Sequence, residues 1–222
     1  MRILNERPVL LSASSAFAIR GVLPRLARFT DLHPGLRVEF TLNDDRHDLV
    51  GESVDVALRP GVLNDSTAVA RKIGVAHRVV VAAPAYLQRA GTPSAPGDLT
   101  NHTVILGPAG RGTEGWAFRR DGKAASIRVE ARFILNGMDA AAAAAVSGLG
   151  VLSTGDLSVL AELETGRLVR VLSDWEMGTI DINVLLPAGR AAKPSARAFS
   201  DFMAAEFREM QAARDRGERV AS

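Results

Sequence analysis

The glycine-rich stretch GRGTEG, residues 110–115, has the G-x-G-x-x-G spacing of loops that hold the pyrophosphate of a dinucleotide. Such a loop needs a strand before it and a helix that begins at its third glycine, where free N–H groups bind phosphate. Val104–Leu106 supplies the strand, but Trp116–Arg120 alternates as a strand does and Asp121-Gly122 is a hairpin turn sequence. Glu130, placed roughly where a ribose-binding acid would be, alternates within a strand and is expected to face solvent. The sequence therefore favours a turn, and no cofactor is predicted.

Other residues that could carry chemistry have simpler interpretations. Asp44-Asp45 could act as a carboxylate pair or bind a metal, but a helix cap explains adjacent acids better. The chain has no cysteine, which excludes thiolate chemistry. No nucleophile–base pair is visible, so no enzymatic activity is predicted. The histidines lack metal-ligand spacing and no metal site is predicted; they are His33, His47, His77 and His102.

Length and composition indicate an ordinary globular protein. The 222 residues are 47% hydrophobic and 23% charged, with a formal net charge of +2, so a sizeable core is expected. The arginines are scattered along the chain, which does not favour a nucleic-acid-binding surface. No apolar run reaches the roughly 20 residues that span a bilayer, and the N-terminus lacks the apolar core of a signal peptide. We expect a cytoplasmic protein without membrane contact.

The first part of the chain predicts a βαβαβ unit. A strand at 9–11 precedes a helix over 16–32, whose apolar residues recur every three or four positions. An alternating strand at 38–42, a short helix through Leu49-Val50 and a strand at 54–58 follow. This order implies a parallel sheet with right-handed crossovers.

The second part of the chain predicts another α/β unit. This unit lies between two strands, of which the first is apolar throughout and the second alternates before it becomes fully apolar. These strands, at 79–83 and 180–187, bracket strands at 104–106, 127–135 and 168–172 and helices at 138–147 and 157–163. We interpret the pair as crossovers: the chain leaves one subdomain, builds a second and returns. A final amphipathic helix carries apolar residues on one face: Phe199, Phe202, Met203, Phe207 and Met210. The predicted fold class is α/β, with two Rossmann-like subdomains joined by two crossover strands.

Polar residues stand at matching strand-to-helix junctions of the two subdomains. Ser14 and Ser15 follow the first strand, and Asn136-Gly137 precedes the alanine-rich helix. Ligands of open α/β sheets bind beyond the carboxyl ends of the strands, where helix N-termini offer free donors. Two such edges across a hinge would suit a small anion or polar metabolite. The alternative, that these residues only cap helices, uses the same geometry and stays open.

Several segments resemble the effector-binding domain of LysR-type transcriptional regulators. They include HPGLRVEFTLNDDRHDLVGESVDVALRPG, VARKIGVAHRVVVAAPAYLQRAGTPSAPGDLTNHTVI, WAFRRDG and LETGRLVRVL, and the likeness runs from about residue 8 to about residue 208. The resemblance implies a fold like that of type 2 periplasmic binding proteins, with an effector cleft between subdomains 8–80 plus 187–212 and 81–186, followed by a polar tail at 213–222. The cleft lining that it implies is Ser14, Ser15, Asn43, Arg59, Gly61, Asn136 and Thr154.

The resemblance also implies a function and partners. We expect the ligand-sensing and oligomerisation domain of a regulator, with a small-molecule effector in the cleft, either an organic anion or an aromatic metabolite. A homodimer or tetramer is expected, in which the helix over 16–32 packs against the second subdomain of a partner. DNA would be bound only through an N-terminal winged helix-turn-helix, for which no segment before residue 8 has room. The alternatives are a solute-binding protein of a transport system and an enzyme on a related two-lobed fold.

Overall fold

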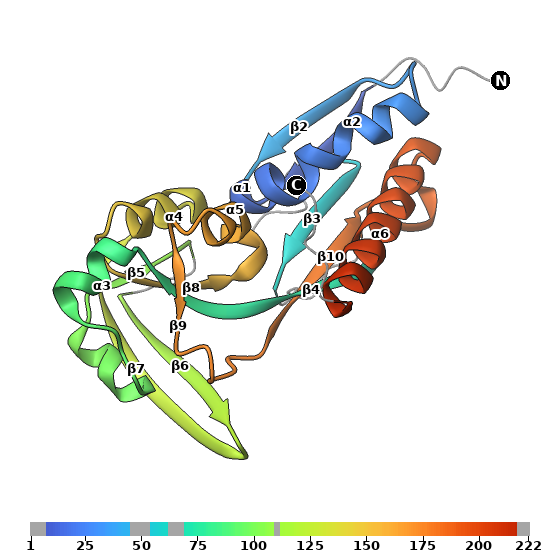
Figure 1. Ribbon diagram of the computed structural model, residues 1–222. Coiled ribbons are helices and arrows are strands. Elements are labelled where there is room, and N and C mark those ends of the chain that lie inside the picture. The colour runs from blue at the N-terminus through green and yellow to red at the C-terminus, as the bar shows by residue number, and fades with distance from the viewer. Residues whose placement is uncertain (1–7, 45–53, 62–68, 109–111, 217–222) are drawn as a thin grey trace. The chain divides into compact units, whose positions relative to one another are not determined.

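The computed structural model describes residues 8–44, 54–61, 69–108 and 112–216 (Figure 1). The chain divides into two compact units, with boundaries between Val75 and Ala76 and between Ile180 and Asp181. Strands β4 (Val69–Ala82) and β10 (Thr179–Leu186) run across these boundaries. Unit 1 is therefore built from both ends of the chain and unit 2 from its middle. This arrangement confirms the predicted α/β fold class with two crossover strands; the sequence placed the boundaries a few residues later, at 80/81 and 186/187.

Unit 1 contains a mainly parallel sheet. β1 (Val9–Ala13) pairs in parallel with both β2 (Val38–Leu42) and β3 (Val56–Pro60), so that Ala13 lies opposite Leu42 on one side and Leu58 on the other. β10 closes the edge of β3 in the antiparallel direction. The short helix predicted through Leu49-Val50 lies outside the described residues.

The helix predicted over 16–32 is present but is not uniform. It consists of α1 (Ser15–Phe17), a π-helical turn, η1 (Ala18–Val22), and α2 (Leu23–Leu32). Gly21 in the π turn lies against the ring of Phe17, and a Cβ atom there would be only 2.8 Å from the ring. A glycine at this position therefore lets the Phe17 ring, which is buried, pack along its own helix.

Helix α6 (Pro194–Asp215) lies beside α2 in unit 1. Its apolar face buries Phe199, Met203 and Phe207 completely, as the spacing of its apolar residues predicted. Phe29 of α2 meets Phe199 edge to face, with ring centroids 5.1 Å apart, a favoured geometry for aromatic pairs. These aromatic contacts fix α6 to the N-terminal helix although the two segments lie far apart in the sequence.

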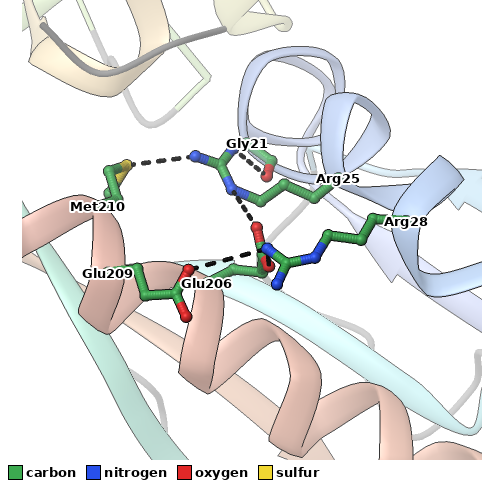
Figure 2. Close-up of polar contacts among 6 residues, drawn as sticks. All are labelled: Gly21, Arg25, Arg28, Glu206, Glu209 and Met210. Carbon is green, nitrogen blue, oxygen red and sulfur yellow. Dashed lines mark hydrogen bonds and ion pairs between the residues drawn. The ribbon is translucent and has the colours of Figure 1, made fainter. Parts of the chain in front are cut away.

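Two arginines of α2 reach across to α6 (Figure 2). Arg25 Nη1 donates to the carbonyl oxygen of Gly21 at 2.9 Å, and its Nε lies 3.7 Å from Glu206 Oε2. Arg28 Nη1 lies 2.6 Å from the other oxygen of Glu206. Burial lowers the pKa of Arg25, and the Glu206 carboxylate opposes this shift. Glu206 thus compensates a guanidinium that has lost most of its water.

Unit 2 contains a mixed sheet and a long hairpin. β4 pairs antiparallel with β8 (Val151–Gly155) and with β9 (Val169–Val171). β5 (Val104–Leu106) lies in parallel between β8 and β7 (Lys123–Ile134), and β7 forms the hairpin with β6 (Thr113–Arg120), which Figure 1 shows projecting from the rest of unit 2.

The glycine-rich stretch belongs to this hairpin. Gly115 lies within β6 and no helix begins there. Asp121 and Gly122 both have positive φ, 48° and 76°, as a two-residue hairpin turn requires. Glu130 on β7 is exposed. The helix that a dinucleotide-binding loop requires is thus replaced by strand β6, which begins at Thr113, while Gly110 and Arg111 lie outside the described residues.

The helices of unit 2 are α3 (Pro84–Ala90), η2 (Pro96–Asn101), α4 (Met138–Val146), η3 (Asp156–Val159) and α5 (Leu160–Glu164). α4 packs on β5 and β8 through the buried Ala141, Ala142 and Ala145, so the alanine-rich composition permits a close helix–sheet contact. The Tyr86 hydroxyl links α3 to the end of η2: it accepts from the N–H of Thr103 at 2.9 Å and lies 3.1 Å from His102 Nδ1. No helix within the described residues is both long and apolar enough to cross a membrane.

The burial of His102 beside Tyr86 predicts that the free energy of unfolding depends on pH. Burial lowers the pKa of His102, while the Asp98 carboxylate acts in the opposite direction. The unfolded chain therefore binds the proton more readily, and stability should fall as pH drops below the ordinary histidine pKa of about 6.5. Urea unfolding between pH 7 and pH 5 should show this slope in the native chain and a smaller slope in His102→Gln. Equal slopes in both proteins would contradict the assignment.

The joint between α2 and α6 predicts unequal effects for two neighbouring glutamates. Glu206→Gln leaves the guanidinium of Arg25 without its compensating charge and should cost about 1–3 kcal/mol of unfolding free energy, between the values for exposed and buried ion pairs. Glu209→Gln is the matched control, because Glu209 is largely exposed and lies 3.8 Å from an exposed Arg28. It should cost less than about 0.5 kcal/mol. Thermal unfolding of both variants measures the difference. Similar losses of unfolding free energy would show that the ion pair between Arg25 and Glu206 does not stabilise the joint.

Candidate functional site

The candidate site in unit 1 lies at the carboxyl-end edge of three adjacent parallel strands. Ser14 and Ser15 follow β1, Asn43 follows β2, and Arg59 lies near the end of β3. Because the register places Ala13 opposite both Leu42 and Leu58, these four residues lie at one edge of the sheet. Gly61 follows β3 at the same edge. The structure thus brings together all five residues that the sequence predicted in this unit.

Asp44 occupies the donors at the start of α1. Its Oδ1 accepts from the backbone N–H of Ser15 at 2.9 Å, and its Oδ2 accepts from the Ser15 hydroxyl at 2.5 Å. A carboxylate is favoured at this position by the helix dipole and by the free N–H group. The sequence expected Asp44 to cap the helix that follows it, which lies outside the described residues. The described bonds show it at the helix that follows β1 instead.

Ser14 has a different environment from Ser15. It is the N-cap residue of α1 by position, with extended backbone, yet its side chain makes no capping hydrogen bond. The Asp44 carboxylate accepts the hydrogen bond from the first turn instead, so capping does not explain a hydroxyl at Ser14. The alternative that these residues only cap helices is therefore weaker for Ser14. Ser15 does have a structural role, through its hydrogen bonds to Asp44.

Arg59 brings a buried guanidinium to the same edge. The residue is 8% exposed, and its Nη2 donates to the hydroxyl of Ser12, itself fully buried, at 2.7 Å. Its Nη1 donates to the carbonyl oxygen of Leu58 at 3.2 Å. These two hydrogen bonds fix the guanidinium at the sheet edge, against Ser12 of β1 and the backbone of β3.

Gly61 continues this edge with a backbone that glycine adopts readily. Its φ is 95°, in the left-handed region. Its N–H donates to the carbonyl oxygen of Asp181 at 2.7 Å, and its carbonyl oxygen accepts from Asn183 Nδ2 at 3.2 Å. Asn183 also lies opposite Arg59 in the ladder between β3 and β10. β10 thus holds the turn after β3 in place.

Unit 2 has its own edge of the same kind. β5, β7 and β8 run in the same direction, so Gly107, Asn136 and Thr154 stand at or beside their carboxyl ends. The Thr154 hydroxyl donates to the sulfur of Met138, the first residue of α4, at 3.3 Å. Gly107 makes room for that side chain, because a Cβ atom there would lie 2.6 Å from Met138 Cε. Both predicted residues of unit 2, Asn136 and Thr154, therefore belong to one edge.

Asn136 does not serve as a helix cap. The N-cap position of α4 is Gly137, which has no side chain to cap the helix. Asn136 is exposed. Like the Ser14 hydroxyl in unit 1, its amide therefore has no capping role that would explain it.

The remaining candidates from the sequence do not gather into a site. Within the described part of the chain, no three His, Asp or Glu side chains are arranged to hold a metal ion. His33 ends α2 and stacks near Phe29, with ring centroids 4.7 Å apart, and His102 contacts Tyr86. His47 and Asp45 lie outside the described residues.

Sequence reasoning missed two polar residues that support the edge in unit 1, Ser12 and Asn183, and the partner of a third, Asp44. Ser12 was read only as part of a polar cluster, although it alternates with the core residues Leu11 and Ala13 and so faces the opposite side of the sheet. Asn183 stands out as the one amide in the apolar run INVLL. Asp44 was detected, but its partner lies 29 positions away, and no local pattern specifies such a pair.

Comparison with known proteins decides the family. The sequence model described as the LysR substrate binding domain matches residues 4–208. The chain belongs to this family. It is 31% identical over 192 residues to an HTH-type transcriptional regulator of Xanthomonas campestris and 30% identical over 182 residues to an uncharacterized HTH-type transcriptional regulator of Haemophilus influenzae. These alignments cover 85% and 82% of the chain but only 56% and 63% of the two relatives.

Solved structures of LysR-type regulators share the fold. The full-length structure of the Vibrio cholerae virulence activator AphB aligns over 89% of the chain and 67% of its own length, with a TM-score of 0.75 and 28% identity. The regulatory domain of CrgA from Neisseria meningitidis aligns over 91% of the chain and all of its own length, with a TM-score of 0.81. At 24% identity, the latter match concerns the fold alone. The expected periplasmic-binding-protein-like fold is thereby confirmed.

The bonds at the start of α1 predict a contrast between adjacent serines. Asp44→Ala and Ser15→Ala each remove part of the cap and should cost about 0.5–2 kcal/mol of unfolding free energy. Ser14→Ala removes no capping bond and should change stability by less than about 0.5 kcal/mol. Chemical denaturation of the three variants measures the difference. A large loss in Ser14→Ala would mean that its hydroxyl has a structural role after all.

Proposed function

We propose that the chain is the ligand-sensing domain of a LysR-type transcription regulator and that a small-molecule effector binds in the interdomain cleft expected for this family. The observation that carries the proposal is the pair of polar side chains, Ser14 and Asn136, that stand at strand-to-helix junctions without capping either helix. Polar residues in such positions are available to a ligand. Family membership and the names of the relatives support the regulatory role.

The charges at the edge of unit 1 refine the class of effector. Asp44 takes the two donors of Ser15, so a simple anion would have to compete with a carboxylate for them. Arg59 supplies a buried cation at the same edge. A ligand that offers a hydrogen-bond donor to Asp44, such as an amino or hydroxy acid, therefore satisfies this edge better than a plain carboxylate.

A ligand would act through its preference for one arrangement of the two units. A ligand shifts a conformational equilibrium only by its difference in affinity for the two states. The chain passes between the units on β4 and β10 alone, which leaves two strands to accommodate a change. We propose that this change reaches DNA through a winged helix-turn-helix elsewhere in the full-length regulator.

Self-association is the second part of the proposal. The helical segment over residues 15–32 exposes Ile19 and Leu23 at 44% and 42%. Apolar side chains gathered on one exposed helix indicate a protein contact. We propose that this helix packs against a second copy of the chain in a dimer or tetramer.

A matched ligand series tests the proposed effector class. Alanine, lactate and propionate share a carbon skeleton and differ in the group that would meet Asp44, and longer homologues extend each series. We expect an amino or hydroxy acid at 100 times its Kd to stabilise the folded chain by about 2.7 kcal/mol, which is seen as a higher melting temperature. The matched plain carboxylate should raise the melting temperature less. In Asp44→Asn the preference should narrow or reverse.

Two variants locate the binding. Ser14→Ala and Asn136→Ala should each reduce the ligand-induced shift while leaving the melting temperature without ligand nearly unchanged. A shift that persists in both variants would place the ligand elsewhere, and no shift across the series and a broad metabolite library would contradict the sensor role of this chain. A winged helix-turn-helix encoded upstream in the same reading frame supports the regulator, whereas a secretion signal there supports the transport alternative.

A further inference from the structure

A pocket of about 300 Å³ lies within unit 2. Its apolar lining includes Val79 and Val80 of β4, Val171 and Leu172 at and just after the end of β9, Phe118 of β6 and Trp175. We call it the Trp175 pocket. Its volume is at the lower end of the range for ligand sites, which fits a ligand with a single ring.

The turn that closes the Trp175 pocket is held at both ends. Glu176 and Arg119 of β6 exchange two backbone hydrogen bonds of 2.8 Å, and the N–H of Arg78 on β4 donates to the carbonyl oxygen of Gly178 at 3.0 Å. Leu172, where the turn begins, has a φ of 54°, a conformation that a leucine rarely adopts. Strained residues persist where the surrounding structure fixes them, and they cluster at ligand sites.

Trp175 contributes an unused donor. Its Nε1 is buried and has no hydrogen-bond partner among the described residues, although buried indole N–H groups usually find one. The ring is held by its surroundings: Phe118 meets it edge to face with centroids 6.5 Å apart, and the Arg120 guanidinium lies 4.4 Å from its centroid. The pocket wall thus contains a fixed indole ring whose N–H has no partner among the described residues.

The charged residues that line the pocket favour an anion. Arg78 and Arg170 are partly exposed, and their carboxylate contacts are long: Arg78 lies 3.8 Å from Glu114, and Arg170 lies 3.4 Å from Asp156. Glu176 is the acidic residue of the lining, which also includes His77. Within the lining, two arginines stand beside one glutamate, while Glu114 and Asp156 lie outside it at these long distances. Guanidinium groups bind carboxylates with directed hydrogen bonds.

We propose that the Trp175 pocket is a second ligand site, contained within unit 2, for a small aromatic monocarboxylate. The ring of the ligand lies against the valines, Phe118 and Trp175, and its carboxylate meets the arginines at the rim and the indole N–H. The lining includes His77 and Arg78, the start of unit 2 on β4, and Gly178 and Thr179, just before the chain leaves it. A bound ligand would therefore stiffen the segments by which the chain enters and leaves unit 2.

Phenylacetate tests this proposal, with the neutral phenylacetamide as its matched control. The chain has two tryptophans, and Trp116 is fully buried elsewhere in the core, so the two indole N–H signals in a ¹H–¹⁵N NMR spectrum report separately. We expect saturable movement of the Trp175 signal with phenylacetate while the Trp116 signal stays in place. Phenylacetamide should bind about tenfold more weakly, because it lacks the charge that strengthens hydrogen bonds to arginine.

Calorimetric titration of three variants completes the test. Arg170→Gln should weaken phenylacetate binding about tenfold, and Trp175→Phe, which keeps a ring but removes the N–H, should weaken it by a few-fold. Arg167→Gln is the matched control, because Arg167 also lies 3.4 Å from a buried carboxylate, that of Glu162, but does not line the pocket; it should bind as the native chain does. The absence of saturable binding, equal weakening in Arg167→Gln, or loss of binding in Ser14→Ala instead would overturn the proposal.

Discussion

Parallel pairing of β1 with β2 on one side and β3 on the other determines where polar side chains gather in unit 1. Parallel strands end at the same edge, and the register that places Ala13 opposite both Leu42 and Leu58 fixes which residues follow at that edge. A shift of one residue in either pairing would turn the side chains of that strand to the opposite face. The strand cores hold the register because they are buried: Leu11, Ala13, Val56, Ala57 and Leu58 have no or almost no exposed surface.

Electrostatics then decides what this edge can bind. Asp44 and Arg59 bring opposite charges to the ends of β2 and β3, on either side of β1, and each is held by a serine, Ser15 and Ser12 respectively. Side chains held by such bonds need little reorganisation when a ligand arrives, which lowers the entropic cost of binding. The edge in unit 2 has no comparable charge among Gly107, Asn136 and Thr154. The two edges are alike in backbone geometry but differ in chemistry.

The sequence predicted much of the fold because local patterns carry it. The amphipathic spacing from Phe199 to Met210 and the Asp121-Gly122 turn specify an element within a few residues, and both are present as expected. The π turn at Ala18–Val22 was not predictable, since it depends on how the Phe17 ring packs over Gly21.

The candidate site was predictable only in part, for the same reason. Strand-to-helix junctions can be recognised from local residues, which is how Ser14 and Asn136 were found. The bond between Asp44 and Ser15 joins two separate strands, and the Trp175 pocket combines β4, β6 and the turn after β9. No single stretch of sequence specifies either the bond or the pocket. Asn183 is an intermediate case: an amide in an apolar strand signals a polar neighbour but does not identify it.

The division of the chain between the two units has a consequence for how the protein is made. Unit 2 is one continuous segment, from Ala76 to Ile180, and its core is complete once that segment has left the ribosome. Unit 1 is not: the edge of β3 has no β10 to pair with, and Phe29 has no Phe199 to pack against, until the last fifth of the chain is synthesised. The N-terminal part of unit 1 is therefore synthesised before unit 2 but reaches its final packing only after it, and the edge of β3 and the aromatic face of α2 lack these partners during the synthesis of unit 2.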